Sequence, residues 1–166
     1  MPLVFLATGS NMGARETTLA RAKEALAARG LREVWSSALY LTEPVGGPPQ
    51  DWYLNQVVAG ETSLSPDGLL ELCRALEGEA GRVRGVKDGP RTLDIDILFH
   101  GDLVRDSPEL TLPHPRLHER RFVLVPLVEI APALVHPRLL LSVSELLARC
   151  DDRSQVARHA PAGALA

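Results

Sequence analysis

The sequence predicts an α+β fold that begins with a βαββαβ unit. Apolar runs typical of strands alternate with two segments in which apolar residues recur at helical spacing. Glycine, serine and proline residues mark the points where these segments begin and end. This order is the split-βαβ, ferredoxin-like arrangement, an antiparallel sheet with helices on one face. With 166 residues the chain is long enough for a real core, so we expect one domain, residues 1–166.

The first strand and the first helix follow from residues 3–30. The run LVFLAT at 3–8 is typical of a buried strand, and it ends at Gly9. Apolar residues then recur at helical spacing between Leu19 and Ala27. Gly30 is a residue type that commonly follows a helix, so we expect the helix to stop there.

Two further strands and a second helix are expected before residue 90. The β-rich runs 34–42 and 52–62 are separated by EPVGGPPQD, whose glycines and prolines exclude regular structure. Ser65 and Pro66 are suited to the N-cap and the first position of a helix that ends at Gly81. The last strand of the unit follows within residues 93–98.

The remaining residues supply extra C-terminal helices. Helical patterns run through VLVPLVEIA at 123–131 and SVSELLARC at 142–150, whereas the tail from Asp152 shows little pattern. We expect these helices to cover the second face of the sheet, which would give an α/β/α three-layer sandwich. The Ala-rich final residues are expected to be frayed.

Composition narrows the possible partners. The formal charge of −3 and the pI near 5.9 argue against a general nucleic-acid or membrane surface, although 16 of the 18 basic residues are arginines. Cys73 and Cys150 form no CxxC pair, and Cys73 falls in a helical pattern that suits a buried thiol. The apolar start is too short for a signal peptide and no run reaches 18 apolar residues, so we expect a cytoplasmic protein.

The stretch GPRTLDIDILFHG at 89–101 contains two aspartates two residues apart in an apolar run. In a strand, Leu93, Ile95 and Ile97 point to one side, and Asp94 and Asp96 point to the other. The two aspartates are then about 6–7 Å apart at their Cα atoms, at about 3.3 Å rise per residue. Their charges repel unless a cation lies between them, so the pattern is consistent with a metal site.

A solvated sheet face is the competing interpretation of this DxD pair. The surrounding residues favour a metal and phosphate site, because Arg91 and the GRVR stretch at 81–84 place three arginines within fifteen residues of the aspartates. Carboxylate oxygens suit Mg²⁺, and guanidinium groups suit phosphate oxygens.

Six sequence blocks occur in a fixed order along the chain: GSN at 9–11, YLTEPVG at 40–46, YLN at 53–55, GRVR at 81–84, GPRTLDIDIL at 89–98 and LPHPRLHERRFVLVPL at 112–127. Together they resemble the 6-hydroxymethyl-7,8-dihydropterin pyrophosphokinase family of folate synthesis. The order of all six matches, and the resemblance spans nearly residues 3–132. It implies transfer of the β,γ-diphosphate of ATP to the hydroxymethyl oxygen of the pterin, with release of AMP.

The resemblance assigns the catalytic residues. It implies that Asp94 and Asp96 hold two Mg²⁺ ions that bridge the triphosphate and contact the attacking hydroxyl. Arg82 and Arg91 match family arginines on mobile loops that reach the phosphates. A helix C-terminal cation is the alternative interpretation of Arg82.

The resemblance also assigns the ATP-binding residues. His114, in LPHP, matches a family histidine that contacts the phosphates, although a His between two prolines is more often a turn residue. Arg84 and Arg120 match nucleotide-binding positions. Glu77 matches a position near the adenosine, and an exposed helix face explains Glu77 equally well.

Five residues match the pterin site of the family. Asn55 would offer donors and an acceptor to the edge of the heterocycle, and Tyr53 and Phe122 would sandwich the ring. Core packing is the alternative for these two aromatics. Backbone groups around Thr42 and Val45 would complete the pocket, on a loop stiffened by proline. The implied partners are ATP and the pterin, with no nucleic acid or membrane, and we expect a monomer.

One position departs from the family pattern. The family usually has a tryptophan just before GPR that seals the two pockets, whereas this chain has Asp88 there and a loop that is one residue shorter. This departure bears on the closing contact of the lid and leaves the metal pair and the pterin pocket unaffected.

Three other classes of protein offer alternative interpretations of this sequence. In nucleotidyltransferases of the polymerase-β type, the DxD follows the GS motif by roughly a dozen residues, whereas here Ser10 and Asp94 are 84 positions apart. An RNA-binding module of ferredoxin-like fold needs exposed aromatics and a basic sheet face. This chain has only seven Phe, Trp and Tyr residues and places acids on the sheet. A purely structural or partner-binding domain would show no affinity for ATP.

Overall fold

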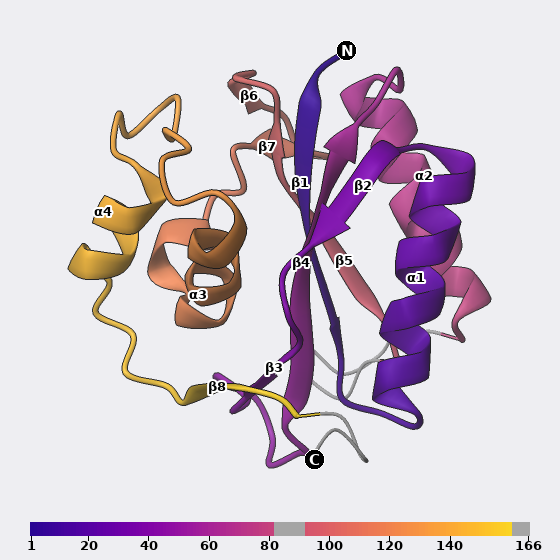
Figure 1. The fold of residues 1–166 in the computed structure, drawn as a ribbon, viewed down its shortest axis with the longest axis vertical. Helices are drawn as coiled ribbons and strands as arrows, with labels where there is room; N and C mark the ends of the chain where they lie inside the picture. The colour runs from indigo at the N-terminus through magenta and orange to yellow at the C-terminus, as the bar shows by residue number, and fades with distance from the viewer. Residues whose placement is uncertain (82–91, 161–166) are drawn as a thin grey trace.

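A computed structural model describes residues 1–81 and 92–160 of the chain. A central sheet lies between two helical layers, with α1 and α2 on one side and α3 and α4 on the other (Figure 1). The three-layer α/β/α arrangement expected from the sequence is therefore confirmed. Within the described residues, no helix combines the length and the apolar character needed to cross a bilayer.

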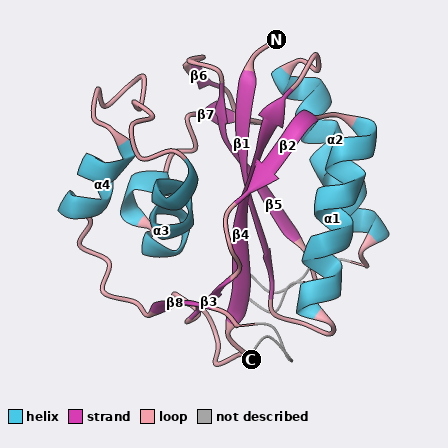
Figure 2. Cartoon of the chain, viewed as in Figure 1, coloured by secondary structure: helices cyan, strands magenta, loops and turns pink. Residues whose placement is uncertain are grey.

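The main sheet has six strands, and its strand pairs are antiparallel (Figure 2). Its order is β5-β1-β4-β3-β8, and β2 also pairs with β4. The strand bounds are β1 Leu3–Ser10, β2 Arg32–Ser36, β3 Tyr40–Thr42, β4 Tyr53–Glu61, β5 Asp94–His100 and β8 Val156–Arg158. The order agrees with the expected ferredoxin-like unit, in which the first and last strands lie side by side.

The helices begin and end where local chemistry allows. The helix bounds are α1 Arg15–Arg29, α2 Pro66–Glu79, α3 Arg121–Ile130 and α4 Val143–Arg149, with a 3₁₀ turn, η1, at Leu117–Glu119. Ser65 caps α2, as expected, because its hydroxyl accepts a hydrogen bond from the N–H of Gly68. A reciprocal capping box between Ser142 and Glu145 begins α4.

Each face of the sheet has its own hydrophobic core. The core beneath α1 and α2 includes Leu6, Leu26, Leu69, Ile95 and Ile97. The core beneath α3 and α4 includes Phe5, Val57, Leu98, Leu124 and Leu127. Most of these side chains are almost fully buried, and burying a side chain of this size contributes about 1.5–3 kcal/mol. The sheet is therefore a rigid platform, held from both sides.

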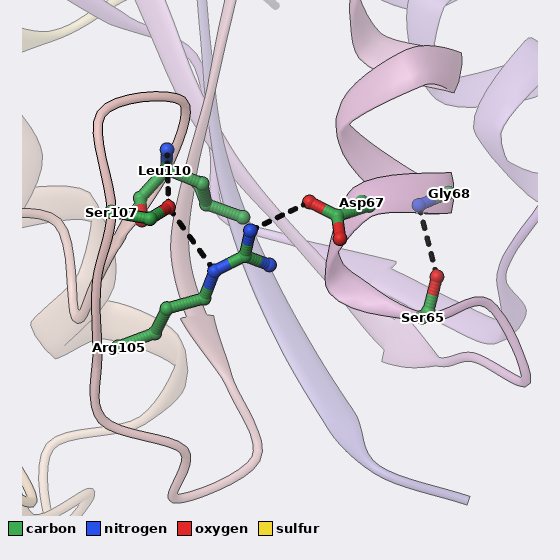
Figure 3. Close-up of polar contacts among 6 residues, drawn as sticks. All are labelled: Ser65, Asp67, Gly68, Arg105, Ser107 and Leu110. Atoms are coloured by element: carbon green, nitrogen blue, oxygen red, sulfur yellow. Dashed lines mark hydrogen bonds and ion pairs between the residues drawn. The ribbon is translucent and has the colours of Figure 1, made fainter.

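A small hairpin connects β5 to the second half of the chain. Strands β6, Arg105–Asp106, and β7, Thr111–Leu112, pair with each other. The guanidinium of Arg105 contacts the Asp67 carboxylate at 2.9 Å and donates to the Ser107 hydroxyl at 3.2 Å (Figure 3). Ser107 in turn donates to the carbonyl oxygen of Leu110. These contacts fasten the hairpin to the first turn of α2.

Two features of the sheet differ from the sequence expectation. The run 34–42 is not one strand, because β2 ends at Ser36 and β3 begins at Tyr40, and each pairs separately with β4. At this break the Ser37 hydroxyl accepts from the N–H of Val57 at 3.0 Å, and the Glu129 carboxylate accepts from the N–H of Ala38. The second difference is β8, a strand in the tail where the sequence shows little pattern.

Candidate active site

A row of three aligned residues crosses three neighbouring strands on one face of the sheet, with polar side chains at its two ends. Gly9 of β1 stands opposite Asn55 of β4 on one side and opposite Asp94 of β5 on the other. Directly opposed residues in an antiparallel sheet point to the same face. The register therefore brings Asn55 and Asp94 to one surface, separated by a strand position that carries no side chain.

Gly9 is needed where the Asn55 side chain crosses it. A Cβ atom at position 9 would lie 2.5 Å from Asn55 Oδ1 and 3.6 Å from the Tyr53 ring. The buried Asn55 amide donates to the Thr42 hydroxyl at 2.6 Å, and Thr42 stands opposite Tyr53 in the sheet. The structure thus brings together three of the predicted pterin residues, Thr42, Tyr53 and Asn55.

The two aspartates lie on this same face of β5. Ile95 and Ile97 are buried in the core beneath α1 and α2, whereas Asp94 is half-buried and Asp96 is exposed. This confirms the predicted alternation. Asp96 stands opposite Ala7, so the neighbouring strand offers only small residues beside the carboxylates.

The carboxylates of Asp94 and Asp96 suit a hard cation that a bound ligand also coordinates. Carboxylate oxygens are the ligands that Mg²⁺ prefers, and Asp94 and Asp96 present them on one strand face. Among the described residues, no group of three or more His, Cys, Asp and Glu side chains is placed to enclose a metal.

Glu77 of α2 contacts the aspartate strand from the other face. Its side chain is buried, and Oε2 accepts a hydrogen bond from the N–H of Ile95 at 2.9 Å. The exposed helix face that was the alternative interpretation of Glu77 is not what the structure shows. Ile95 lies between Asp94 and Asp96, so this contact holds the backbone that carries both carboxylates.

His114 lies in the chain that follows the hairpin, beside β5. Its N–H donates to the carbonyl oxygen of Leu98 at 2.9 Å, and its ring Nδ1 accepts from the N–H of Arg116 at 3.2 Å. Burial, with help from the nearby Arg120 and Arg116 charges, lowers the pKa of His114 to about 4. The imidazole is therefore neutral at pH 7, and its Nε2–H can act as a hydrogen-bond donor.

Two further predicted residues, Arg120 and Phe122, lie at the start of α3. The Arg120 guanidinium lies 5.7 Å from the centroid of the Phe122 ring, a cation–π distance. Phe122 is partly buried and packs against the core beneath α3 and α4, so core packing remains an alternative role for its ring.

The loop between β3 and β4 is held at its end by residues that sequence reasoning missed. The Asn11 amide donates to the Gln50 side chain at 2.7 Å and to the carbonyl oxygen of Asp51 at 3.1 Å. The Arg15 guanidinium donates to the carbonyl oxygen of Trp52 at 2.7 Å. The sequence signal that could have indicated the first of these contacts is Asn11 in the GSN block. Val45, the remaining predicted pterin residue, is 55% exposed on this loop.

Three predicted residues fall outside the described part of the chain. Arg82, Arg84 and Arg91 belong to residues 82–91, as does Asp88 at the position where the family usually has tryptophan.

Comparisons with known proteins agree with the motif-based resemblance. A sequence model described as "7,8-dihydro-6-hydroxymethylpterin-pyrophosphokinase (HPPK)" matches residues 5–132. The 2-amino-4-hydroxy-6-hydroxymethyldihydropteridine pyrophosphokinase of Methylorubrum extorquens is 51% identical over 137 residues, which cover 81% of this chain and 86% of the relative. The Bacillus subtilis protein of the same name is 45% identical over 129 residues, 77% of each chain.

Solved structures support the fold. A structure described as HPPK-DHPS in complex with substrates superposes with a TM-score of 0.68 at 13% identity, covering 89% of this chain. A Plasmodium falciparum HPPK-DHPS structure superposes with a TM-score of 0.70 at 14% identity. This chain spans 43% of the length of each of those chains.

The fold and the comparisons together define an α+β enzyme of the phosphotransferase class, a pyrophosphokinase. The chain belongs to the 7,8-dihydro-6-hydroxymethylpterin-pyrophosphokinase family.

Proposed function

We propose that this enzyme transfers the β,γ-diphosphate of ATP to the hydroxymethyl oxygen of 6-hydroxymethyl-7,8-dihydropterin, in folate biosynthesis. The products are the pterin diphosphate and AMP. The observation that supports the proposal is the row Asn55–Gly9–Asp94, which brings the Asn55 amide and the Asp94 carboxylate to one face. A pterin seated on Asn55 would extend its hydroxymethyl group across the bare Gly9 position toward the carboxylates.

The pterin site is built from five residues. Asn55 and Thr42, already hydrogen-bonded to each other, would present an amide and a hydroxyl to the edge of the heterocycle. The rings of Tyr53 and Phe122 would stack on its two faces. The backbone near Val45 would close the pocket from the loop, whose far end is tied to Asn11 and Arg15.

Asp94 and Asp96 would hold two Mg²⁺ ions together with the triphosphate. When bound, the ions neutralise phosphate charge and lower the pKa of the attacking hydroxyl. The two side chains keep carboxylate oxygens on the open face of β5, beside the strand position without a side chain. The buried isoleucines that alternate with them fix this orientation.

The remaining residues would bind the nucleotide. Arg82 and Arg91 would reach the phosphates during transfer, and Arg84 and Arg120 would bind the nucleotide. His114 is neutral at pH 7 and would donate from Nε2 to a phosphate oxygen. Glu77 lies on the adenosine side by its match to the family, and its hydrogen bond to Ile95 supports a positioning role as well.

We also propose that the chain acts in the cytoplasm as a single-domain monomer, with ATP and the pterin as its partners and without nucleic acid or membrane. The formal charge of −3 is consistent with the lack of a nucleic-acid partner. Gel filtration with light scattering would measure the mass directly, and a dimer would contradict the proposal.

The experiment that tests the reaction is incubation with ATP, Mg²⁺ and the reduced pterin alcohol. Nucleotide products are separated by ion-exchange chromatography. AMP that forms only when the pterin is present supports the proposal. ADP in place of AMP would assign an ordinary kinase, and no nucleotide turnover would favour a non-catalytic binding domain.

A further inference from the structure

The C-terminal tail adds a strand to the edge of the sheet beside the proposed pterin site. β8 runs antiparallel to β3, and it places Val156 opposite Thr42 and Ala157 opposite Leu41 (Figures 1 and 2). β3 is only three residues long and ends at Thr42. The strand that carries Thr42 is therefore held on both sides, by β4 and by the tail.

Hydrogen bonds continue this pairing past both ends of β8. The N–H of Glu43 donates to the carbonyl oxygen of Gln155 at 3.1 Å, and the N–H of Gln155 donates back to the Glu43 carboxylate at 2.7 Å. Towards the other end, the N–H of His159 donates to the carbonyl oxygen of Leu39 at 2.9 Å. Glu43 is the residue after Thr42, so the tail holds the point where the β3–β4 loop begins.

The tail is also tied to the first helix. The His159 ring Nε2 lies 2.9 Å from Oε1 of Glu16, in the first turn of α1. Arg15, the residue before Glu16, holds the other end of the β3–β4 loop through Trp52. The start of α1 thus fastens the tail and the far end of this loop at adjacent positions.

We propose that residues 155–159 form a C-terminal clamp that positions Thr42 and the start of the β3–β4 loop for pterin binding. The inference rests on the proposed function, because Thr42 is assigned to the pterin there. The clamp lies beyond residues 5–132, the part that the family model matches.

The physical reason is the weakness of a short edge strand. Without β8, β3 would present unpaired backbone groups to water on one side, and three residues pair too few groups to stay ordered against chain entropy. Thr42 would then hold the Asn55 amide less firmly, although their contact is 2.6 Å in the structure. A pocket that must be ordered by its ligand binds that ligand more weakly.

Backbone direction along the tail provides a matched pair of variants. The N–H groups of Gln155 and His159 both point toward β3, so that of Ala157, midway between them, does as well, whereas that of Arg158 points away. Proline has no N–H. Ala157→Pro should therefore break the clamp, and Arg158→Pro should leave it paired. Both side chains are exposed, so neither change empties a core.

Two readouts follow each full-length variant. Hydrogen exchange at the Glu43 amide reports whether the tail is docked, because that N–H donates to Gln155. Steady-state kinetics then separates KM for the pterin from KM for ATP and from kcat. If Ala157→Pro leaves the tail docked, the double variant Ala157→Pro with His159→Ala also removes the contact to Glu16.

We expect KM for the pterin to rise on the order of tenfold in the undocked variant, because pterin binding must then order a loosened pocket. KM for ATP, kcat and the Arg158→Pro control should stay within about twofold, since the change is local. An unchanged pterin KM in a variant with an exposed Glu43 amide would overturn the proposal, as would a tail that stays docked in both variants. Wild-type protein that forms no AMP would instead contradict the proposed function.

Discussion

Oε2 of Glu77 accepts a hydrogen bond from the backbone N–H of Ile95 at 2.9 Å, from the helical side of the sheet opposite the aspartates. A buried carboxylate on α2 thus fixes the one residue that lies between Asp94 and Asp96. The helix therefore positions β5 from the face of the sheet opposite the two aspartates.

Removing this acceptor should loosen β5 where the aspartates begin. We expect Glu77→Leu to lower the free energy of unfolding by about 1–3 kcal/mol, because the buried N–H of Ile95 loses its partner. Glu77→Gln keeps an acceptor oxygen and should lose less. Urea unfolding of the three proteins measures the difference, and equal losses in the two variants would show that the carboxylate charge matters more than this hydrogen bond.

Gly9→Ala should disturb the pterin site selectively. The new Cβ would lie 2.5 Å from Asn55 Oδ1, so the Asn55 amide must leave the position from which it donates to Thr42. We expect a higher KM for the pterin with little change in KM for ATP, and a stability loss of about 1–3 kcal/mol from overpacking.

The matched control for this variant is Gly78→Ala in α2. A Cβ at position 78 would meet no atom within 4 Å. Alanine is the better helix former, so this variant should gain up to about 1 kcal/mol and keep the wild-type kinetics. If the Gly9→Ala enzyme keeps the wild-type KM for the pterin, pterin binding does not require a position without a side chain between Asn55 and Asp94.

His114 should make the fold less stable in acid. Its pKa is about 4 in the folded protein, below the 6.5 of an ordinary histidine, because of burial and of the Arg120 and Arg116 charges. Between pH 4 and 6.5 the unfolded chain binds the proton more readily, so stability falls as the pH drops through this range. The loss at His114 amounts to on the order of 2–3 kcal/mol.

His114→Asn should remove this part of the pH dependence. Chemical denaturation at pH 6.5 and at pH 4.5 then gives a smaller stability difference for the variant than for the wild type. His136, whose pKa is also lowered by burial, remains in both proteins and cancels in the comparison. Equal pH slopes would show that His114 already takes up its proton in the folded state above pH 4.5.

The aspartate pair should control turnover without controlling the fold. We expect Asp94→Asn or Asp96→Asn to remove most activity and to raise the Mg²⁺ concentration needed for half-maximal rate, because each change deletes a hard anionic ligand. Circular dichroism should remain that of the wild type. Wild-type rates in either variant would contradict the metal assignment.

Local sequence signals predicted most of the fold. β1, β4 and α2 lie close to their expected bounds, because apolar runs and the Ser65–Pro66 start act over a few residues. The break within 34–42 depends on contacts of Ser37 with Val57, distant in sequence, so no local pattern shows it. β8 pairs with the edge that β3 offers, and its own three residues are mostly exposed and show no strand pattern.

The sequence indicated which types of residue form the site better than it indicated how these residues are arranged. The spacing of Asp94 and Asp96 already indicated a shared face, which the burial of Ile95 and Ile97 confirms. That Asn55 would join them across Gly9 depends on the register of three strands, a relationship that no single motif contains. The roles assigned by the family resemblance remain predictions until they are measured.

ATP labelled with ³²P at the β-phosphate distinguishes transfer of a diphosphate from transfer of a single phosphate. The wild-type enzyme is incubated with this ATP, Mg²⁺ and 6-hydroxymethyl-7,8-dihydropterin, and the products are separated by chromatography. We expect the β-label to leave the nucleotide and to appear in the pterin product, with unlabelled AMP. Label retained in ADP, with only the γ-phosphate on the pterin, would contradict this expectation.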